Sequence, residues 1–427
     1  MTPVLILLGS FIGLLLLRVP ISLTLALSSF FTVFYLGLPP MVVLQKLCDP
    51  LDNFSLMAIP FFVLAGQLMT EAGIARRLVD VSNVFVGHIR GGLALANIVA
   101  SMLFGGMSGS SVADTASIGS IMIPEMVRKG YDRDYSIAVT VTSSTEGLVI
   151  PPSHNAIIYS FAAGGVSIAK LFLAGAIPGI LIGLCLMIPA YIIAVKRGYP
   201  INPRVGRKEA IRIILDSVWG LLTIVIILGG VLSGIFTATE SSVAAVVYAF
   251  FIAVFVYKEI TFKGILKVLR ETVTTTAIVM FLIASASSFG WLLSYLKVPD
   301  MIATAIVSIS SNKYVILLII NVVLLLLGMI MDMAPLILIT TPIFLPVVTR
   351  FGVDPVHFGI IMMMNLGIGL CTPPVGNTLF VGCVVGKMKM EEVMKAMFPF
   401  YAAMVGALML VTYVPAIAMW LPSLLWR

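Results

Sequence analysis

Long apolar runs, separated by Gly, Pro and short charged stretches, set the pattern of this chain. The apolar positions within each run are continuous rather than alternating, which predicts helices and not the strands of an outer-membrane barrel. Helices are expected near 4–17, 21–38 and 54–70, followed by a mixed, amphipathic segment at 72–90. The first run could be taken for a signal peptide. It has no basic stretch before it, so we interpret it as a retained helix.

A pair of prolines interrupts an apolar run at two places. The stretches LVIPPSHNAIIY and LCTPPVGNTLF share one spacing: Pro151, Pro152 and Asn155 in the first, and Pro373, Pro374 and Asn377 in the second. A helix broken inside a membrane leaves free backbone groups, which can bind an ion or an anionic group. We therefore expect the breaks at 151–155 and 373–377 to line a substrate cavity.

The chain also resembles itself at a shift of 222 residues. Between 124–155 and 346–377, nine of 32 positions are identical without a gap. Each copy follows a hairpin-like stretch of two short apolar arms, about 92–128 and 314–349, which we predict to be re-entrant. Flanking basic residues predict that the first hairpin enters from the cytoplasm and the second from outside. Such an inverted-topology repeat is typical of secondary transporters.

Composition and charge agree with an all-α polytopic membrane protein. Hydrophobic residues form 60% of the 427 and charged residues only 11%, against about a quarter in soluble domains. The basic clusters at 196–212 and 257–271 are placed in the cytoplasm, so the net charge of +7 does not indicate nucleic-acid binding. We expect about ten transmembrane helices plus the two hairpins, with both termini outside.

The expected division of the chain follows from these anchors. It comprises scaffold helices at 1–71, an amphipathic arm at 72–90, a first transport half at 91–195, a cytoplasmic linker at 196–216, scaffold helices at 217–296, a second arm at 297–313 and a second transport half at 314–427.

Oxygen-bearing side chains gather at the hairpin tips and beside the breaks. Hard cations such as Na⁺ are held by hydroxyl, carbonyl and carboxylate oxygens. The candidate Na⁺ ligands are Ser108, Ser110, Ser111, Asp114, Thr145, Asn155, Asp332, Thr372 and Asn377. Asp332 aligns with Ser110 at the 222-residue shift. The serines could instead serve helix packing. Glu146, just before the first break, either faces the cavity or has a structural partner, and Glu240 is expected to be structural.

Enzyme signatures are not found in the sequence. His88, His154 and His357 are far apart, and there is no HExxH, Walker A, GxSxG or CxxC pattern. The four cysteines are scattered and suggest neither a disulfide framework nor a metal site. We expect no enzymatic activity, no cofactor, and no metal other than Na⁺.

Several motifs together resemble the large membrane subunit (M subunit) of the tripartite ATP-independent periplasmic, or TRAP, transporters. They are AIPFFVLAGQLM at 58–69, GMSGSSVADTASIG at 106–119, IPPSHNAIIY at 150–159, KLFLAGAIPG at 170–179, KRGYP at 196–200, GIFTATESS at 234–242 and GLCTPPVGNTLF at 369–380. The family usually has a proline where this chain has Ala238.

This resemblance implies a Na⁺-driven elevator transporter in a bacterial inner membrane. It also implies a separate small four-helix subunit (Q subunit), a periplasmic substrate-binding protein (P subunit) and a small organic acid, such as a C4-dicarboxylate, sialic acid or another sugar acid. SGSS and the stretch around KLFLAG would suit sialic acid. By the same resemblance, the Na⁺-site residues fall on Ser108, Ser110 and Asp332.

Three other interpretations remain open at this point. A stand-alone Na⁺/carboxylate symporter would need no binding protein, and an ion channel would need a continuous polar pore. A purely structural membrane subunit gives no purpose to paired broken helices.

Overall fold

The computed structural model describes residues 2–425, and every regular element in that range is helical. The first half contains α1 (Thr2–Leu16), α2 (Ile21–Tyr35), α3 (Met41–Cys48), the 3₁₀ turns η1 (Asp49–Asp52) and η2 (Phe54–Met57), α4 (Ala58–Glu71), α5 (Ile74–Val86), α6 (Gly92–Ser108), α7 (Ser111–Arg128), α8 (Arg133–Ser143), η3 (Ser144–Leu148), α9 (His154–Ala162) and α10 (Ile168–Lys196). The second contains α11 (Arg207–Leu232), α12 (Ala238–Phe251), the π-helical turn η4 (Ile252–Val256), α13 (Phe262–Tyr295), α14 (Val298–Ile309), α15 (Lys313–Gly328), α16 (Met333–Arg350), α17 (Pro355–Leu370), α18 (Asn377–Gly386), α19 (Met390–Tyr413) and α20 (Ala416–Leu425).

Seven helices within the described range are long and apolar enough to cross a membrane. They are η2–α4, α10, α11, α12–η4, α13, α16 and α19. The other apolar helices have 10–17 residues, and the hairpin arms α6 and α15 are among them. A multi-pass membrane protein follows from this, whereas the count of about ten spans stays a prediction.

The two halves of the chain match element by element at the shift of 222 residues. Helix α7 begins at Ser111 and α16 at Met333 (333 − 111 = 222), and the two helices also end 222 residues apart. Helix α8 with η3 corresponds to α17, and the starts of α10 and α19 differ by the same number (390 − 168 = 222). The weak sequence repeat therefore reflects two copies of one structural unit.

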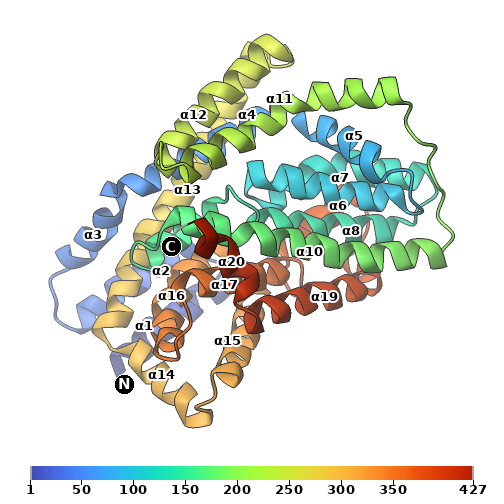
Figure 1. Cartoon of the computed structure of the whole chain (residues 1–427). Coiled ribbons are helices and arrows are strands. Elements are labelled where there is room, and N and C mark those ends of the chain that lie inside the picture. The colour runs from blue at the N-terminus through green and yellow to red at the C-terminus, as the bar shows by residue number, and fades with distance from the viewer. Residues whose placement is uncertain (1, 426–427) are drawn as a thin grey trace.

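The hairpins and broken helices pack on one another across the two halves. Helices α6, α7, α8 and α10 lie side by side on the right of Figure 1, and α15, α16, α17 and α19 lie below them. The second arm of each hairpin packs on the broken helix of the other half: α7 contacts α18, and α16 contacts α9. Helices α1–α4, α12 and α13 gather on the opposite side.

Glycines let each hairpin approach its own broken helix at backbone distance. A Cβ atom on Gly147 would lie 2.3 Å from the Cα atom of Gly105, and one on Gly369 would lie 2.6 Å from the Cα atom of Gly328. Gly147 and Gly369 are repeat equivalents. Any side chain there would push the hairpin away, so glycine is required in both copies.

The arms and linkers differ in detail from the expected bounds. Helix α11 already begins at Arg207, so only the first part of the expected linker at 196–216 is non-helical. The arm helix α5 is held by Arg77, whose guanidinium bonds Asp216 at 2.9 Å and Glu259 at 2.6 Å and lies 3.7 Å from the ring centre of Tyr257. Glu240 closes a capping box with Thr237 at the start of α12, which gives it the expected structural role.

Candidate functional site

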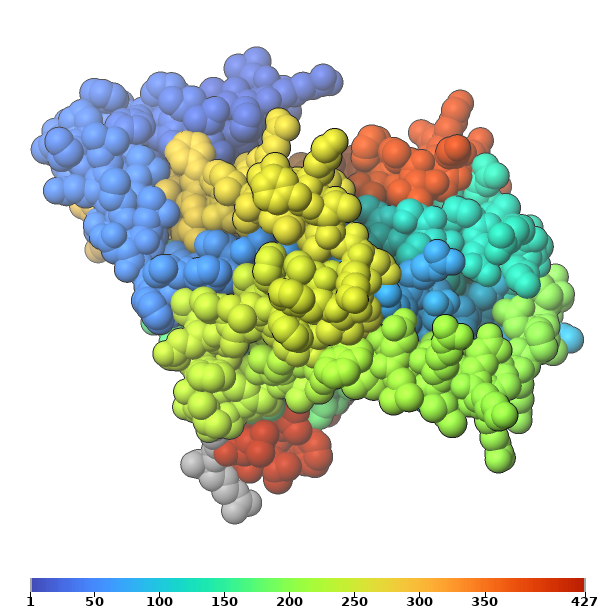
Figure 2. Space-filling view, turned by 90° about the horizontal axis from the view of Figure 1, so that it is seen from above, coloured from blue at the N-terminus to red at the C-terminus, as the bar shows by residue number. Residues whose placement is uncertain are grey.

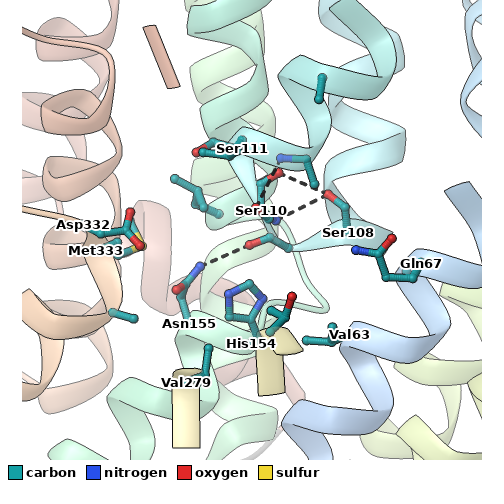
Figure 3. Close-up of a pocket in the computed structure, with 18 of the residues that line it drawn as sticks. Val63, Gln67, Ser108, Ser110, Ser111, His154, Asn155, Val279, Asp332 and Met333 are labelled. Atoms are coloured by element: carbon teal, nitrogen blue, oxygen red, sulfur yellow. Dashed lines mark hydrogen bonds between the residues drawn. The ribbon is translucent and has the colours of Figure 1, made fainter. Parts of the chain in front are cut away.

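A cavity of about 560 Å³ lies where the two hairpin tips meet helices α4 and α13. Figure 3 shows it with Asp332 on one side, Gln67 on the other, and the tip of the first hairpin between them. Its polar lining comprises Gln67, Thr70, Ser108, Ser110, Ser111, Ser117, His154, Asn155, Thr275 and Asp332. Of the predicted Na⁺ ligands, the structure thus brings Ser108, Ser110, Ser111, Asn155 and Asp332 together at one cavity.

The tip of the first hairpin is a two-residue turn that local sequence explains. Helix α6 ends at Ser108, and Gly109 follows with a φ of 61°, a conformation that glycine adopts without strain. Ser110 then caps α7, because its hydroxyl accepts a hydrogen bond from the Ala113 N–H at 3.3 Å. The Ser110 N–H donates to the Ser108 hydroxyl at 3.4 Å. The three residues therefore turn two serine hydroxyls toward the cavity.

The tip of the second hairpin places a carboxylate at the equivalent position. Asp332 is the N-cap residue of α16, as Ser110 is of α7, but its side chain is exposed in the cavity. The backbone N–H of Met333 and the side chain of Asn377 are its hydrogen-bonding neighbours. No basic side chain forms an ion pair with Asp332 within residues 2–425. A bound cation would supply the missing positive charge.

Each helix break is tied to a hairpin tip. The Asn155 amide donates to the Gly109 carbonyl at 3.2 Å, and the Val375 N–H donates to the Met329 carbonyl at 3.1 Å. Across the halves, the hydroxyls of Ser111 and Thr378 are 2.8 Å apart. The breaks, tips and both halves thus form one hydrogen-bonded unit around the cavity.

Helix ends of both polarities border this cavity. The N-termini of α7, α9 and α16 contribute Ser111, His154 and Met333 to its lining. The C-terminal ends of α6, η3 and α17 contribute Ser108, Leu148 and Leu370. Free N–H groups at helix starts favour anions, whereas free carbonyls at helix ends favour cations. The arrangement suits a site that takes a cation and an acid group together.

Several predicted site residues lie behind the cavity wall and not on it. Thr145 and Thr372 donate their hydroxyls to the carbonyls of Thr142 and Ile368 in their own helices. Asn377 reaches the site only through Asp332. Glu146 and the four break prolines, Pro151, Pro152, Pro373 and Pro374, are also outside the lining. At both breaks the residues beside the prolines border the cavity.

Asp114 and Glu146 are the deepest charged side chains near the site. Both are fully buried, and within the described chain none of their four carboxylate oxygens has a hydrogen-bond partner. The two groups are near enough to repel each other when both are charged. The Glu146 side chain points toward Met102 and α10, where a Cβ on Gly183 would be 3.2 Å from Oε2. The structure therefore supplies no partner for Glu146.

Sequence reasoning missed the wall that α4 and α13 contribute. Gln67 is a polar residue inside an apolar helix, and Thr275 belongs to the polar stretch TVTTT within α13. Both interruptions were available as signals. His154 was considered only as a metal ligand, and within residues 2–425 no group of His, Cys, Asp and Glu side chains could hold a metal ion by itself. All four cysteines are free.

Comparison with known proteins identifies the unit. Residues 8–417 match the family described as the tripartite ATP-independent periplasmic transporter, DctM component. An uncharacterised Salmonella typhimurium protein, YgiK, is 46% identical over 99% of this chain and 98% of its own length. A C4-dicarboxylate TRAP transporter large permease from Pseudomonas aeruginosa is 43% identical over 88% of each chain, and a sialic acid TRAP large permease from Vibrio cholerae is 39% identical over 89% of each.

Among solved structures, the Alcanivorax borkumensis YdaH transporter has a similar fold. Its TM-score is 0.63 over 92% of this chain and 90% of that one, at 14% identity. The likeness supports a transporter fold for the paired hairpins and broken helices. With the family match across nearly the whole chain, the conclusion is direct: this protein belongs to the DctM family, the large membrane permease component of tripartite ATP-independent periplasmic transporters.

Proposed function

We propose that the protein imports a small organic acid by Na⁺-driven secondary transport. The observation that carries this proposal is the cavity where an unpaired carboxylate, Asp332, faces two serine hydroxyls among helix ends of both polarities. Carbonyl ends, hydroxyls and Asp332 would hold Na⁺, and the amide ends of α7, α9 and α16 would face the acid group. Ser108, Ser110, Ser111, Asn155 and Asp332 are the proposed Na⁺ ligands at the cavity.

A second group of proposed ligands lies deeper. Asp114 is buried without a hydrogen-bond partner within residues 2–425, so a cation there would offset a costly isolated charge. Thr145, Thr372 and Asn377 would contribute oxygens beside the breaks. Proteins hold Na⁺ with oxygen ligands of these kinds, and coupling arises when ion and substrate sites share the same flexible backbone.

Transport would proceed by an elevator motion of the hairpin unit. The hydrogen bonds across the halves, such as Ser111 to Thr378, bind both hairpins and both broken helices into one body. Re-entrant hairpins cannot open in lipid without stranding backbone groups, which favours rigid movement over unfolding. Helices α1–α4 and α11–α13 would form the scaffold, and the first hairpin would enter from the cytoplasm and the second from the periplasm.

The protein would work with two partners, as the word tripartite in its family description suggests. These are a small four-helix membrane subunit and a periplasmic binding protein that delivers the acid. The names of two relatives point to C4-dicarboxylates and sialic acid as candidate substrates. Both classes carry carboxylates, which is the feature that the helix N-termini at the cavity would recognise.

Reconstitution in proteoliposomes tests the proposal. The chain and its small subunit, with the binding protein encoded beside them, should accumulate labelled succinate or N-acetylneuraminate only under an inward Na⁺ gradient. Accumulation that needs no Na⁺ gradient would contradict the coupling. Equal uptake by this chain alone, without either partner, would instead favour a stand-alone Na⁺/carboxylate symporter.

A further inference from the structure

The cavity continues along the scaffold side into a second, more open pocket. Gln67 of α4 and Thr275 of α13 line both. The second pocket has a volume of about 710 Å³, and its other lining residues are Leu266, Lys267, Arg270, Glu271 and Thr274. A continuous strip of polar side chains therefore leads from the hairpin tips to the basic first turns of α13.

Arg270 differs from the other basic side chain of this strip. The Lys267 ammonium pairs with the Glu71 carboxylate at 3.0 Å. Arg270 is exposed and forms no ion pair within residues 2–425. Its guanidinium therefore keeps its charge and its planar set of donors available to an incoming acid group.

Gln67 is also without a protein partner where the two pockets meet. Its half-buried amide makes no hydrogen bond to the rest of residues 2–425. Figure 3 shows this amide beside Ser108, turned toward the tip of the first hairpin. A polar group in such a place normally bonds water or a ligand, because leaving it unpaired costs free energy.

We propose that Arg270, Gln67 and Thr275 form a second subsite, which binds the acid group of the transported anion on its way between the hairpin cavity and the cytoplasm. The subsite rests on the proposed function for the identity of its cargo. Basic residues place the start of α13 in the cytoplasm. Figure 2 shows this part of α13, in yellow, at the surface between the N-terminal segments in blue and the hairpin region in teal.

The physical reason for such a subsite is the scaffold's need to release an anion without trapping it. A single positive charge beside hydroxyl and amide groups attracts an anion and raises its local concentration. It binds only weakly because water still enters the open pocket. Arg270 would guide the acid group outward, while the helix N-termini keep their own role at the hairpin cavity.

Charge-selective labelling of a single cysteine tests the subsite without relying on transport. In the complex with its small subunit, all four native cysteines are replaced and Thr275→Cys is introduced. Inside-out vesicles then react with a negatively charged methanethiosulfonate (the ethylsulfonate) or a positively charged one (the ethyltrimethylammonium). We expect Arg270→Gln to lower the ratio of negative to positive labelling rates about fivefold. Arg270→Lys should keep most of that ratio.

Lys263→Gln is the matched control, because Lys263 is exposed on the same helix but lies outside both pockets. It should leave the ratio unchanged. Millimolar succinate or N-acetylneuraminate should slow the labelling of Thr275→Cys about threefold, and Arg270→Gln should remove this protection. Size-exclusion profiles establish that each variant is folded.

The outcomes separate the subsite from the proposed function. A ratio that does not respond to Arg270→Gln, or labelling that neither acid slows, overturns the subsite even when Na⁺-driven uptake is normal. Protected labelling that depends on Arg270, in a protein without Na⁺-driven uptake, upholds the subsite and refutes the transport proposal.

Discussion

Ser110 and Asp332 occupy the same position in the two halves of the molecule: each is the N-cap residue of the second arm of its hairpin. The Ser110 hydroxyl accepts a hydrogen bond from the Ala113 N–H, whereas the Asp332 carboxylate caps no backbone group of α16 and is exposed in the cavity. One position of the repeat therefore carries a satisfied hydroxyl in one copy and an available charge in the other. The two copies cannot bind a cation equally well.

The first prediction concerns Asp332. Asp332→Asn keeps the shape of the side chain and removes its charge, so the Na⁺ concentration for half-maximal uptake should rise at least about tenfold, equivalent to about 1.4 kcal/mol. Uptake of a labelled acid as a function of Na⁺ concentration measures this. Asp300→Asn is the control, because Asp300 is an exposed partner of Arg350 away from the cavity. An unchanged Na⁺ dependence in Asp332→Asn would remove this residue from the ion site.

The second prediction separates the two buried carboxylates. If Asp114 binds Na⁺, saturating Na⁺ stabilises the folded protein by about 2.7 kcal/mol at a hundred times its Kd, and Asp114→Asn should reduce the resulting rise in Tm. Glu146→Gln should keep the Na⁺-induced rise and increase the Tm without Na⁺, since it removes a buried charge that has no partner within residues 2–425. Thermal unfolding in detergent, with Na⁺ or choline, gives both values. The opposite pattern would exchange the roles of the two residues.

The third prediction tests the close contact between hairpin and broken helix. Gly147→Ala places a Cβ 2.3 Å from the Gly105 Cα atom, and the resulting displacement should cost about 1–3 kcal/mol of stability. Gly229→Ala, in α11 with open space around it, should be neutral or slightly stabilising. The Tm difference between these two alanine variants is the measurement. A fully stable Gly147→Ala protein would mean that the two backbones separate at little cost.

The fourth prediction tests the rigid movement of the hairpin unit. In a cysteine-free background, a disulfide between Gly66→Cys on α4 and Met107→Cys on α6 would join scaffold to hairpin, because a Cβ on Gly66 lies 3.2 Å from the Met107 carbonyl oxygen. Oxidation should stop uptake, and a reductant should restore it. Each single-cysteine variant controls for the loss of the native side chain.

A disulfide inside the hairpin unit is the counterpart. Ile137→Cys on α8 and Gly386→Cys on α18 are in contact across the two halves, with the Cβ position of Gly386 2.4 Å from Cγ1 of Ile137. Uptake should continue after oxidation if the halves move together. Loss of uptake with this internal disulfide would indicate that the two halves slide past each other, which an elevator does not require.

The sequence determined the local features because each depends on nearby residues. Continuous apolar runs predict helices, tandem prolines stop them, and glycine followed by serine makes the tip of the first hairpin. The 222-residue repeat aligned the two hairpins correctly, since both copies keep the same element lengths. Ser108, Ser110 and Asp332 were therefore found from sequence, and the resemblance to the TRAP family was confirmed across residues 8–417.

Only the tertiary structure decided which of these residues share a cavity. Asp114 lies one turn after Ser110 in α7, but it points into the protein while Ser110 and Ser111 border the cavity. Gln67 and Thr275 are more than 200 residues apart, and no local pattern relates them. Which face of a helix meets a cavity depends on the neighbours that cover its other faces, and those contacts come from segments distant in sequence.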